Sequence, residues 1–520
     1  MCTVTVKREA KENTAVVKVY PKPSNIMDTS DSYDQYIFLL FATSMALVLS
    51  IYLIYKHKIP TVSPTLTGQI RQLSPSESYT YDLNKRGMEI ICDMVFVQSR
   101  LPLTSELVTA AAKVLQRKHP LLKMKIMEDS NSKVKVQYFI PMEELVVDVD
   151  DIEAESWEDV HAMEMKTNFN LSTGPLWRVR LLRSNENQES GVHKHILAVS
   201  FVHFIADGNC IMRLFDELMD TLNQISNNES VAETTLPLLP PVEHFFPQCK
   251  IPWWEKILIK SLSKFRGVSM LNREENNHYI RCFPAVISRN PNVVKETRAL
   301  LIELSKEEVQ KLRENCRKHG ATVNGATTAA ASIAVCKIMQ GGKLSRDQQI
   351  HTGFMVDMRK YCGPPLKQDE SFGFFSMLLT LDVTVSNDSD SRSGFWKLAA
   401  KCTNKTKHKL RENGKDAVDR LKIMSIKKNV LKLTALDDLR HVIADKSNGC
   451  RSENIFNMSN LGNCSYLTKE KTRDFELVRK VTATGGVNYQ STFSHFIVTF
   501  HGEMFWSLVY HTNVCTKTKA

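Results

Sequence analysis

Several signatures of metal and nucleic-acid binding are absent from this sequence. Its twelve cysteines are scattered singly from Cys2 to Cys515, with no CxxC pair and no Cys/His cluster at metal-ligand spacing. This density is far below that of a disulfide scaffold, so we expect reduced, mostly buried thiols. No zinc-finger or RNA-binding signature accompanies the modest net charge of +11. We therefore expect no metal site and no nucleic-acid partner.

The remaining composition is that of an ordinary folded protein. Hydrophobic residues make up 42% of the chain and charged residues 24%, while 20 Gly and 18 Pro are too few for a collagen-like or low-complexity protein. At about 100–200 residues per domain, a chain of 520 residues predicts two to four domains or one large two-lobed unit.

One long apolar run stands near the N-terminus. Residues 36–55 form twenty residues without a charge, which as a helix would span about 30 Å, the thickness of the bilayer core. We predict a transmembrane helix here, after a tail of residues 1–35. A cleaved signal peptide is the alternative, but the run starts late and lacks a small-residue cleavage site. Aspartates precede the run and lysines follow it, so we expect the large C-terminal part to face the cytosol, although basic residues in the tail weaken this orientation.

Glycosylation sequons offer a check on that orientation. Six of them occur after the apolar run, at Asn170, Asn228, Asn387, Asn404, Asn457 and Asn463. Glycans on these residues would place the C-terminal part in the lumen instead.

Composition shifts divide the rest of the chain into two lobes. We predict a tether over residues 56–78, an N-terminal lobe over 79–240, a connection over 241–285 and a C-terminal lobe over 286–520. Local patterns predict three helices: one from Thr104 to Pro120, one capped by Ser305 and Glu308, and one from about Asn324. They also predict strands at 133–140, 177–182, 195–202 and 300–304, and a hairpin around His501. Both lobes mix helices and strands, which predicts an α/β fold.

The predicted strand 195–202 runs directly into an HxxxDG sequence, from His203 to Gly208. A turn after a buried strand can present an imidazole at the mouth of a cleft, and Gly208 would permit a tight backbone there. The spacing alone is weak support, because about one HxxxD is expected by chance among fifteen histidines. A second copy, from His441 to Asp445, has a helical context. A histidine satisfied within the core or a turn is therefore the alternative role of His203.

Other short segments accompany HxxxDG in order. They are RKHPLL within residues 107–122, GPLWR at 174–178, TVNG at 322–325 before an Ala-rich helix, VDMR at 356–359 followed by FGFFS at 372–376, and SNLG at 459–462. Together they resemble the CoA-dependent acyltransferase superfamily with the chloramphenicol acetyltransferase-like fold, which includes alcohol acetyltransferases, wax ester synthase/diacylglycerol acyltransferases and peptide-synthetase condensation domains. The resemblance covers roughly residues 70–515. It implies two such lobes forming a V-shaped pair with a central tunnel.

The sequence departs from this superfamily at three points. Val202 stands where many relatives carry a first histidine, and Gly325 stands where an aspartate is common. The DFGWG segment of plant BAHD acyltransferases does not occur near the C-terminus.

The resemblance implies a role for each motif residue. His203 would be the general base that takes a proton from the acceptor and returns it to the CoA thiolate. Asp207 would pair with Arg359 across the lobes and, with Gly208, support the catalytic loop. Asn460 is a candidate for stabilising the oxyanion. The candidates for substrate or tunnel contacts are Trp177, Asn324, Ser376, Ser459 and Asn460.

Each supporting motif also has a structural explanation. Trp177 could be a core aromatic, and Thr322 with Asn324 could simply cap a helix. Asp357 and Arg359 could form a surface pair, and the SNLG segment could be a plain turn.

Two basic regions have open interpretations. An amphipathic helix over residues 254–265 either lies on an anionic membrane or packs on its own lobe. The stretch from Arg392 to Arg451 is either a solvated face or a phosphate site.

These features together predict a membrane-anchored CoA-dependent O-acyltransferase. We expect acyl-CoA as co-substrate, a small lipophilic alcohol as acceptor and no bound cofactor. The alternatives are a catalytically inactive, membrane-tethered binding protein of the same fold and an N-acyltransferase acting on an amine. We expect a monomer with one transmembrane helix, in the endoplasmic reticulum, with its catalytic region facing the cytosol.

Overall fold

A computed structural model divides the chain into two units, Met1–Thr65 and Leu66–Ala520. It describes residues 4–5, 18–19, 70–85, 87–129, 136–154, 156–183, 191–266, 296–367, 369–431, 454–464, 466, 474–484, 491–512 and 515. In the first unit, strand β1 (Val4–Thr5) pairs with β2 (Lys18–Val19) in antiparallel fashion. The predicted transmembrane segment 36–55 lies outside the described residues. None of the helices within the described ranges is both long and apolar enough to cross a membrane.

The first sheet of the larger unit has five strands. Their order is β14 (Phe475–Thr484), β4 (Ile90–Ser99), β9 (His193–Val202), β8 (Trp177–Arg183) and β7 (Val149–Glu153). All neighbours are antiparallel except β7 and β8, which run parallel. Strand β14 comes from the predicted C-terminal lobe, so the second half of the chain supplies an edge strand of the first sheet.

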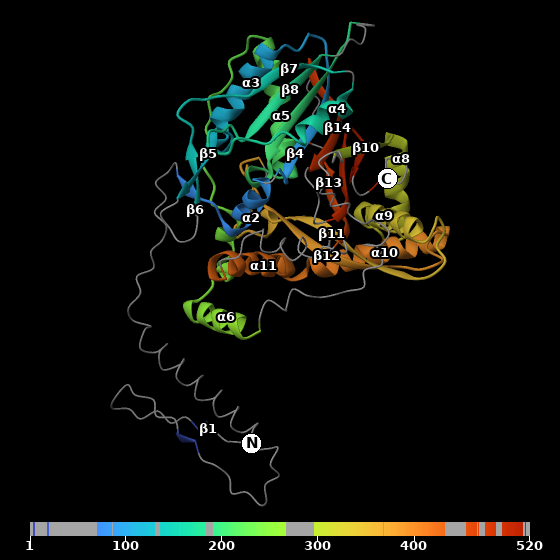
Figure 1. Cartoon of the computed structure of the whole chain (residues 1–520). Coiled ribbons are helices and arrows are strands. Elements are labelled where there is room, and N and C mark those ends of the chain that lie inside the picture. The colour runs from blue at the N-terminus through green and yellow to red at the C-terminus, as the bar shows by residue number, and fades with distance from the viewer. Residues whose placement is uncertain are drawn as a thin grey trace, which may run out of the picture. The chain divides into compact units, whose positions relative to one another are not determined.

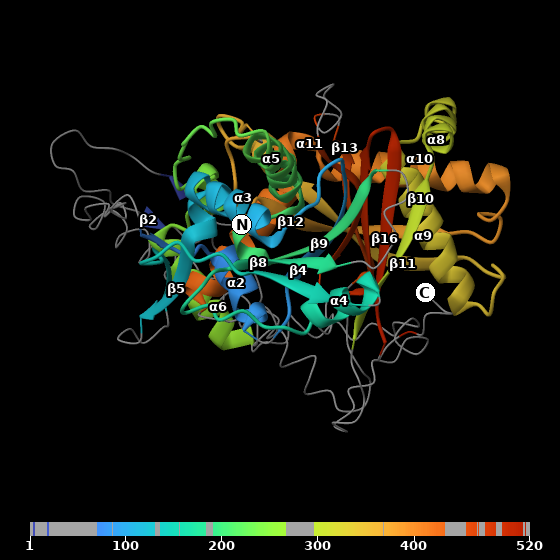
Figure 2. The same cartoon turned by 90° about the horizontal axis from the view of Figure 1, so that it is seen from above.

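Both faces of this sheet are covered. Helices α3 (Ser105–Lys118) and α5 (Gly208–Ser226) pack together on one face, where Ile91 and Val95 of β4 join their core (Figures 1 and 2). Ile90 and Met94 point to the other face and pack with Val160 of α4 (Trp157–Glu164). This two-sided burial explains why β4 is a nearly continuous apolar run rather than an alternating strand.

The second sheet has six strands of mixed direction. Their order is β10 (Thr297–Leu304), β16 (Glu503–His511), β15 (Ser491–Phe500), β13 (Asn454–Asn463), β11 (Gln348–Asp357) and β12 (Ser376–Val385). Strand β13 runs parallel to both of its neighbours, and the other pairs are antiparallel. Helices α8 (Lys306–Lys318), α9 (Val323–Met339) and α10 (Arg392–Lys409) lie on the side of this sheet away from the first sheet (Figure 2).

Smaller elements complete the larger unit. They are β3 (Arg71–Gln72), α2 (Pro75–Asn84), η1 (Pro120–Lys123), β5 (Met124–Asp129), β6 (Val136–Pro141), η2 (His203–Ile205), η3 (Val242–Phe245), η4 (Pro247–Cys249), α6 (Trp253–Arg266), η6 (Arg359–Tyr361), α11 (Arg411–Ser425) and the π-helix η7 (Ile426–Val430). Strands β3, β6 and β5 form a separate antiparallel sheet. Residues 70–78 of the predicted tether thus form β3 and the first turn of α2.

The predicted helix caps are present. The Thr104 hydroxyl accepts the Leu107 N–H at the start of α3, and Ser305 with Glu308 forms the capping box of α8. The predicted C-terminal hairpin is β15 and β16, which turn at His501. The second HxxxD copy and residues 267–285 of the predicted connection lie outside the described residues.

Candidate active site

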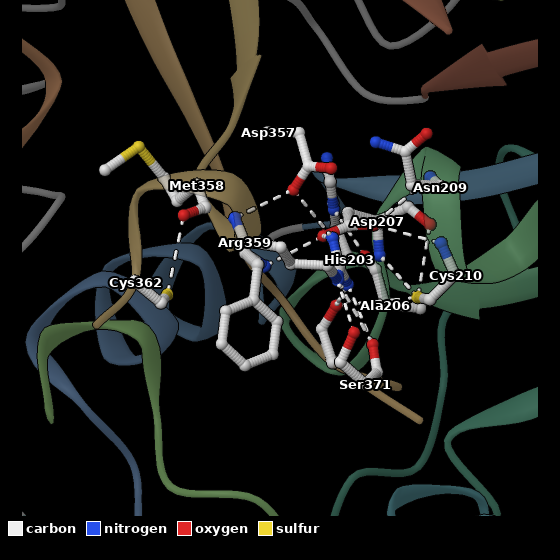
Figure 3. Close-up of polar contacts among 12 residues, drawn as sticks. His203, Ala206, Asp207, Asn209, Cys210, Asp357, Met358, Arg359, Cys362 and Ser371 are labelled. Atoms are coloured by element: carbon white, nitrogen blue, oxygen red, sulfur yellow. Dashed lines mark hydrogen bonds and ion pairs between the residues drawn. The ribbon is translucent and has the colours of Figure 1, made fainter. Parts of the chain in front are cut away.

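The imidazole of His203 lies where β9 ends and the chain turns into α5. Its backbone N–H donates to the Glu89 carbonyl at 3.0 Å. Its Nδ1 lies 3.0 Å from the Ala206 carbonyl oxygen, which can only accept, so Nδ1 carries the hydrogen (Figure 3). In the neutral ring this leaves Nε2 as a proton acceptor. The ring is partly buried and meets the edge of Phe374, from the other half of the chain, at 5.2 Å between centroids.

The Asp207 carboxylate is fully occupied by other groups. Its Oδ1 accepts the backbone N–H groups of Asn209 and Cys210, both at 3.2 Å, and so caps helix α5. Its Oδ2 accepts from Arg359 Nη1 and from the Phe375 N–H, both at 2.8 Å. The carboxylate therefore ties the His203 turn to the second half of the chain and is not available to bind a substrate.

Arg359 is buried, with 1% of its surface exposed. Its Nη1 contacts the carboxylates of Asp207 at 2.8 Å and Asp357 at 3.1 Å (Figure 3). Its Nε donates to the Ser371 hydroxyl at 2.9 Å, and its Nη2 donates to the carbonyls of Ser371 and Gly373. The structure thus contains the ion pair implied by the family resemblance, and the alternative of a surface pair is wrong for Arg359.

Gly208 allows the SNLG segment to approach the start of α5. A Cβ atom at Gly208 would lie 2.9 Å from a methyl carbon of Leu461, so the Leu461 side chain would have to shift to make room for a larger residue. The segment belongs to β13, with a register shift between Asn460 and Asn463, rather than to a plain turn. The Asn460 side-chain oxygen accepts the Gly462 N–H at 2.9 Å, and Ser459 pairs with β15.

Ser376 opens strand β12 two residues after Phe374 and pairs with Asp357 of β11. Its hydroxyl oxygen is buried and has no hydrogen-bond partner among the described residues. A buried hydroxyl without a partner is costly, so this group is able to donate to an incoming acceptor.

Trp177 and Asn324 do not join the His203 cluster. Trp177 is 3% exposed, stacks on Phe201 and donates from Nε1 to the Leu122 carbonyl at 3.1 Å, so the core interpretation is correct and the tunnel interpretation is not supported. Asn324 lies in the first turn of α9, where Thr322 is the N-cap. A hydrogen bond from either residue to His203 is not found within the described part of the chain.

The departure at Gly325 has a packing explanation. A Cβ atom there would lie 2.0 Å from Thr403 Oγ1 and 2.7 Å from the Ala399 carbonyl, both on α10. Helix α9 therefore packs too closely on α10 to carry the aspartate that is common in relatives.

Glu89 is a neighbour of His203 that the sequence interpretation missed. It precedes β4 with a positive φ of 59°, which is strained for a residue with a side chain. Burial raises the pKa of its carboxyl group, and the nearby His203 offsets part of that shift. No local motif distinguishes Glu89, because its position depends on the pairing of β4 with β9.

The cysteine nearest to this turn is not a thiolate. Burial raises the pKa of the Cys210 thiol to about 12, and Asp207 adds to the shift. A cluster of three metal-ligating side chains is not found among the residues that the structure describes.

Comparison with known proteins gives matches to an acetyltransferase family and to peptide synthetases. A profile described as alcohol acetyltransferase matches residues 149–479, which is more than half of the chain. The chain belongs to the alcohol acetyltransferase family. It is also 24% identical over 230 residues to a nonribosomal peptide synthetase, kk1B, of Curvularia clavata, and 30% identical over 138 residues to the cyclosporin synthetase simA of Tolypocladium inflatum. These matches cover 44% and 26% of this chain, but 2% and 1% of those very long proteins.

Solved structures show the fold of this alcohol acetyltransferase family member. Trichothecene 15-O-acetyltransferase TRI3 of Fusarium sporotrichioides aligns with a TM-score of 0.57 at 12% identity, over 89% of this chain and 96% of that one. Polyketide synthase associated protein 5 of Mycobacterium tuberculosis aligns with a TM-score of 0.56 at 15% identity, over 85% and 93%. The predicted α/β fold of this superfamily is therefore confirmed, while the central tunnel stays a prediction.

Proposed function

We propose that this protein transfers an acyl group from acyl-CoA to a hydroxyl acceptor, with His203 as general base. The observation that carries the proposal is the hydrogen bond from His203 Nδ1 to the Ala206 carbonyl at 3.0 Å. It fixes the tautomer in which Nε2 accepts a proton. The ring also lies at the junction of the two halves of the chain, beside Phe374.

The reaction is one proton cycle at this nitrogen. Nε2 removes the acceptor's hydroxyl proton as its oxygen attacks the thioester carbon, forming a tetrahedral intermediate. The C–S bond then breaks, and the proton passes from Nε2 to the CoA thiolate. The products are an ester and free CoA, and no acyl-enzyme is required.

A donor is still needed for the oxyanion of that intermediate. Asn460 remains a candidate, because the Gly462 N–H uses its side-chain oxygen and leaves the amide NH₂ group as a donor. The unpartnered hydroxyl of Ser376 is a second candidate. Removing the correct donor should lower kcat by about 10²–10³-fold with little change in the free energy of unfolding.

The substrate assignment follows from the apolar segment at 36–55 and the name of the matching family. We propose a fatty or other apolar acyl-CoA as donor, with acetyl-CoA as the alternative donor, and a small lipophilic alcohol as acceptor. We further propose that the protein is a monomer that needs no bound cofactor. An amine acceptor is the second candidate, because the chain is similar to peptide synthetases over 230 residues. A catalytically inactive tethered protein of the same fold is the third.

One assay separates these three. The purified full-length protein is incubated with a panel of acyl-CoAs and with mixed alcohols or mixed amines, and thiol release is measured. Alcohol-dependent release that is lost in His203→Ala and kept in His244→Ala, a change of an exposed histidine on η3, supports the proposal. Amine-dependent release favours the N-acyltransferase. If neither alcohols nor amines cause thiol release from any acyl-CoA, the proposed enzymatic function is overturned.

For location, we propose one transmembrane helix at 36–55 in the endoplasmic reticulum, with the catalytic region in the cytosol. In cells, the six sequons should then carry no glycans. A glycosidase-sensitive mass shift would place the catalytic region in the lumen.

A further inference from the structure

Helix α6 exposes an unusual group of apolar side chains. Trp254, Ile257 and Leu258 are 42%, 54% and 49% exposed. Their i, i+3 and i+4 spacing places them on one face of the helix. The sequence left open whether this helix packs on its own lobe, and about half of the surface of each of these three side chains is exposed.

The flank of α6 next to these side chains is attached to the fold. The Glu255 carboxylate lies 2.9 Å from Lys422 Nζ of α11, and the following π-helix η7 is also in contact with α6. Figure 1 shows α6 beside this end of α11, at the margin of the larger unit. The ion pair and the contact with η7 attach α6 to this part of the fold, while Trp254, Ile257 and Leu258 stay about half exposed.

The polar surroundings of this face are basic. Lys256 is exposed on the polar side of α6, and exposed Lys250 precedes the helix. The acidic residue of this stretch, Glu255, is already neutralised by Lys422. The exposed charge around the apolar face is therefore positive.

Size and charge favour a bilayer over a protein as the occupant. A stable protein interface buries about 800 Å² on each partner, more than three side chains of one helix can supply. An interfacial helix needs a narrower surface: an apolar stripe that enters the acyl boundary, a tryptophan at headgroup level, and lysines that attract anionic lipids. Trp254, the two aliphatic residues and the flanking lysines supply each of these.

We propose that α6 is a membrane-docking helix, which inserts Trp254, Ile257 and Leu258 into the headgroup region of an anionic bilayer. The proposal depends on described residues and is independent of the predicted transmembrane segment. It adds a second membrane contact that would fix how the acyltransferase fold is oriented on the surface.

The test is hydrogen–deuterium exchange of the full-length protein in three environments. These are nanodiscs of phosphatidylcholine, nanodiscs containing about 30% phosphatidylserine, and detergent micelles. We expect the amides of Trp253–Arg266 to exchange several-fold more slowly in the anionic nanodiscs. Helix α8, whose apolar content is low, serves as the internal control and should exchange equally in all three. Equal exchange of α6 in all three environments would overturn the proposal.

A variant pair assigns the protection to the exposed face. Ile257→Glu/Leu258→Glu should abolish the slower exchange, whereas Leu145→Glu, at a 40% exposed leucine of the first lobe, should keep it. Protection that rises with protein concentration rather than with phosphatidylserine would assign the face to a second copy of the chain. Binding of both variants to the nanodiscs through residues 36–55 would not change this test, because the test measures exchange only at the amides of α6.

Discussion

Two groups of motif residues in this chain behave very differently. His203 and Asp207 share one turn, and Arg359, from a distant part of the sequence, pairs with Asp207 and so joins this turn to the other half of the fold. Trp177 and Gly325, from equally family-like segments, pack instead within one half, against Phe201 and against α10. The first group places polar atoms where a proton could be moved, and the second sets the packing of the scaffold. A shared motif therefore marks a shared fold, and the roles of individual residues require their contacts.

The sharpest test of this comparison is His203→Ala. Turnover should fall by about 10²–10⁴-fold, because the variant loses the group that accepts the acceptor's proton. The free energy of unfolding should change little, since the ring is partly exposed and its one side-chain bond is local to the turn. Steady-state kinetics and urea denaturation measure the two effects. Undiminished acyl transfer in the variant would eliminate the base assignment.

Arg359→Ala probes the network from its other end. Removing the guanidinium leaves Asp207 as a buried carboxylate without its charge partner, so we expect the free energy of unfolding to fall by about 3–5 kcal/mol. Arg298→Ala is the matched control, because Arg298 also pairs with two carboxylates but is 28% exposed, and its loss should cost about 1 kcal/mol or less. Equal effects of the two changes in chemical denaturation would show that the Asp207 pair does not tie the halves together.

Trp177→Phe tests the scaffold group. The change removes the hydrogen bond to the Leu122 carbonyl and leaves a small cavity in the first core, so we expect a loss of about 1–3 kcal/mol of stability. Because Trp177 stacks on Phe201 rather than lining the site, KM for acyl-CoAs of different length should stay constant. If the variant changes KM by an amount that depends on acyl-chain length, Trp177 contacts the acyl chain, as the tunnel interpretation holds.

Local rules explain which features could be predicted. Caps such as Thr104 and Ser305, the strand before His203 and the terminal hairpin depend on neighbours within a few residues, and the structure has all of them. The edge strand β14 was not predicted to join the first sheet, because its pairing with β4 joins segments far apart in the sequence. Glu89 was missed for the same reason. Trp177 could not be assigned from pattern, since a core aromatic and a tunnel aromatic give the same local sequence.

The paired charges of the active site differ from a histidine of α4 that is buried in neutral form. His161 of α4 is 1% exposed, and burial, assisted by Arg298, lowers its pKa to about 4. An unfolded chain binds this proton near pH 6.5, so the stabilising contribution is present above that pH and is lost as pH falls toward 4.

Glu89 has the opposite effect, because its raised pKa makes the folded protein relatively more stable as the pH falls. Replacing His161 separates its own contribution from that of Glu89. Relative to wild type, His161→Leu should gain about 1 kcal/mol of unfolding free energy between pH 7.5 and pH 5.5, measured by urea denaturation at both values. His244→Leu, at an exposed histidine, should show no such gain. A difference between wild type and His161→Leu that stays constant with pH would mean that His161 takes up its proton in the folded state as readily as in water.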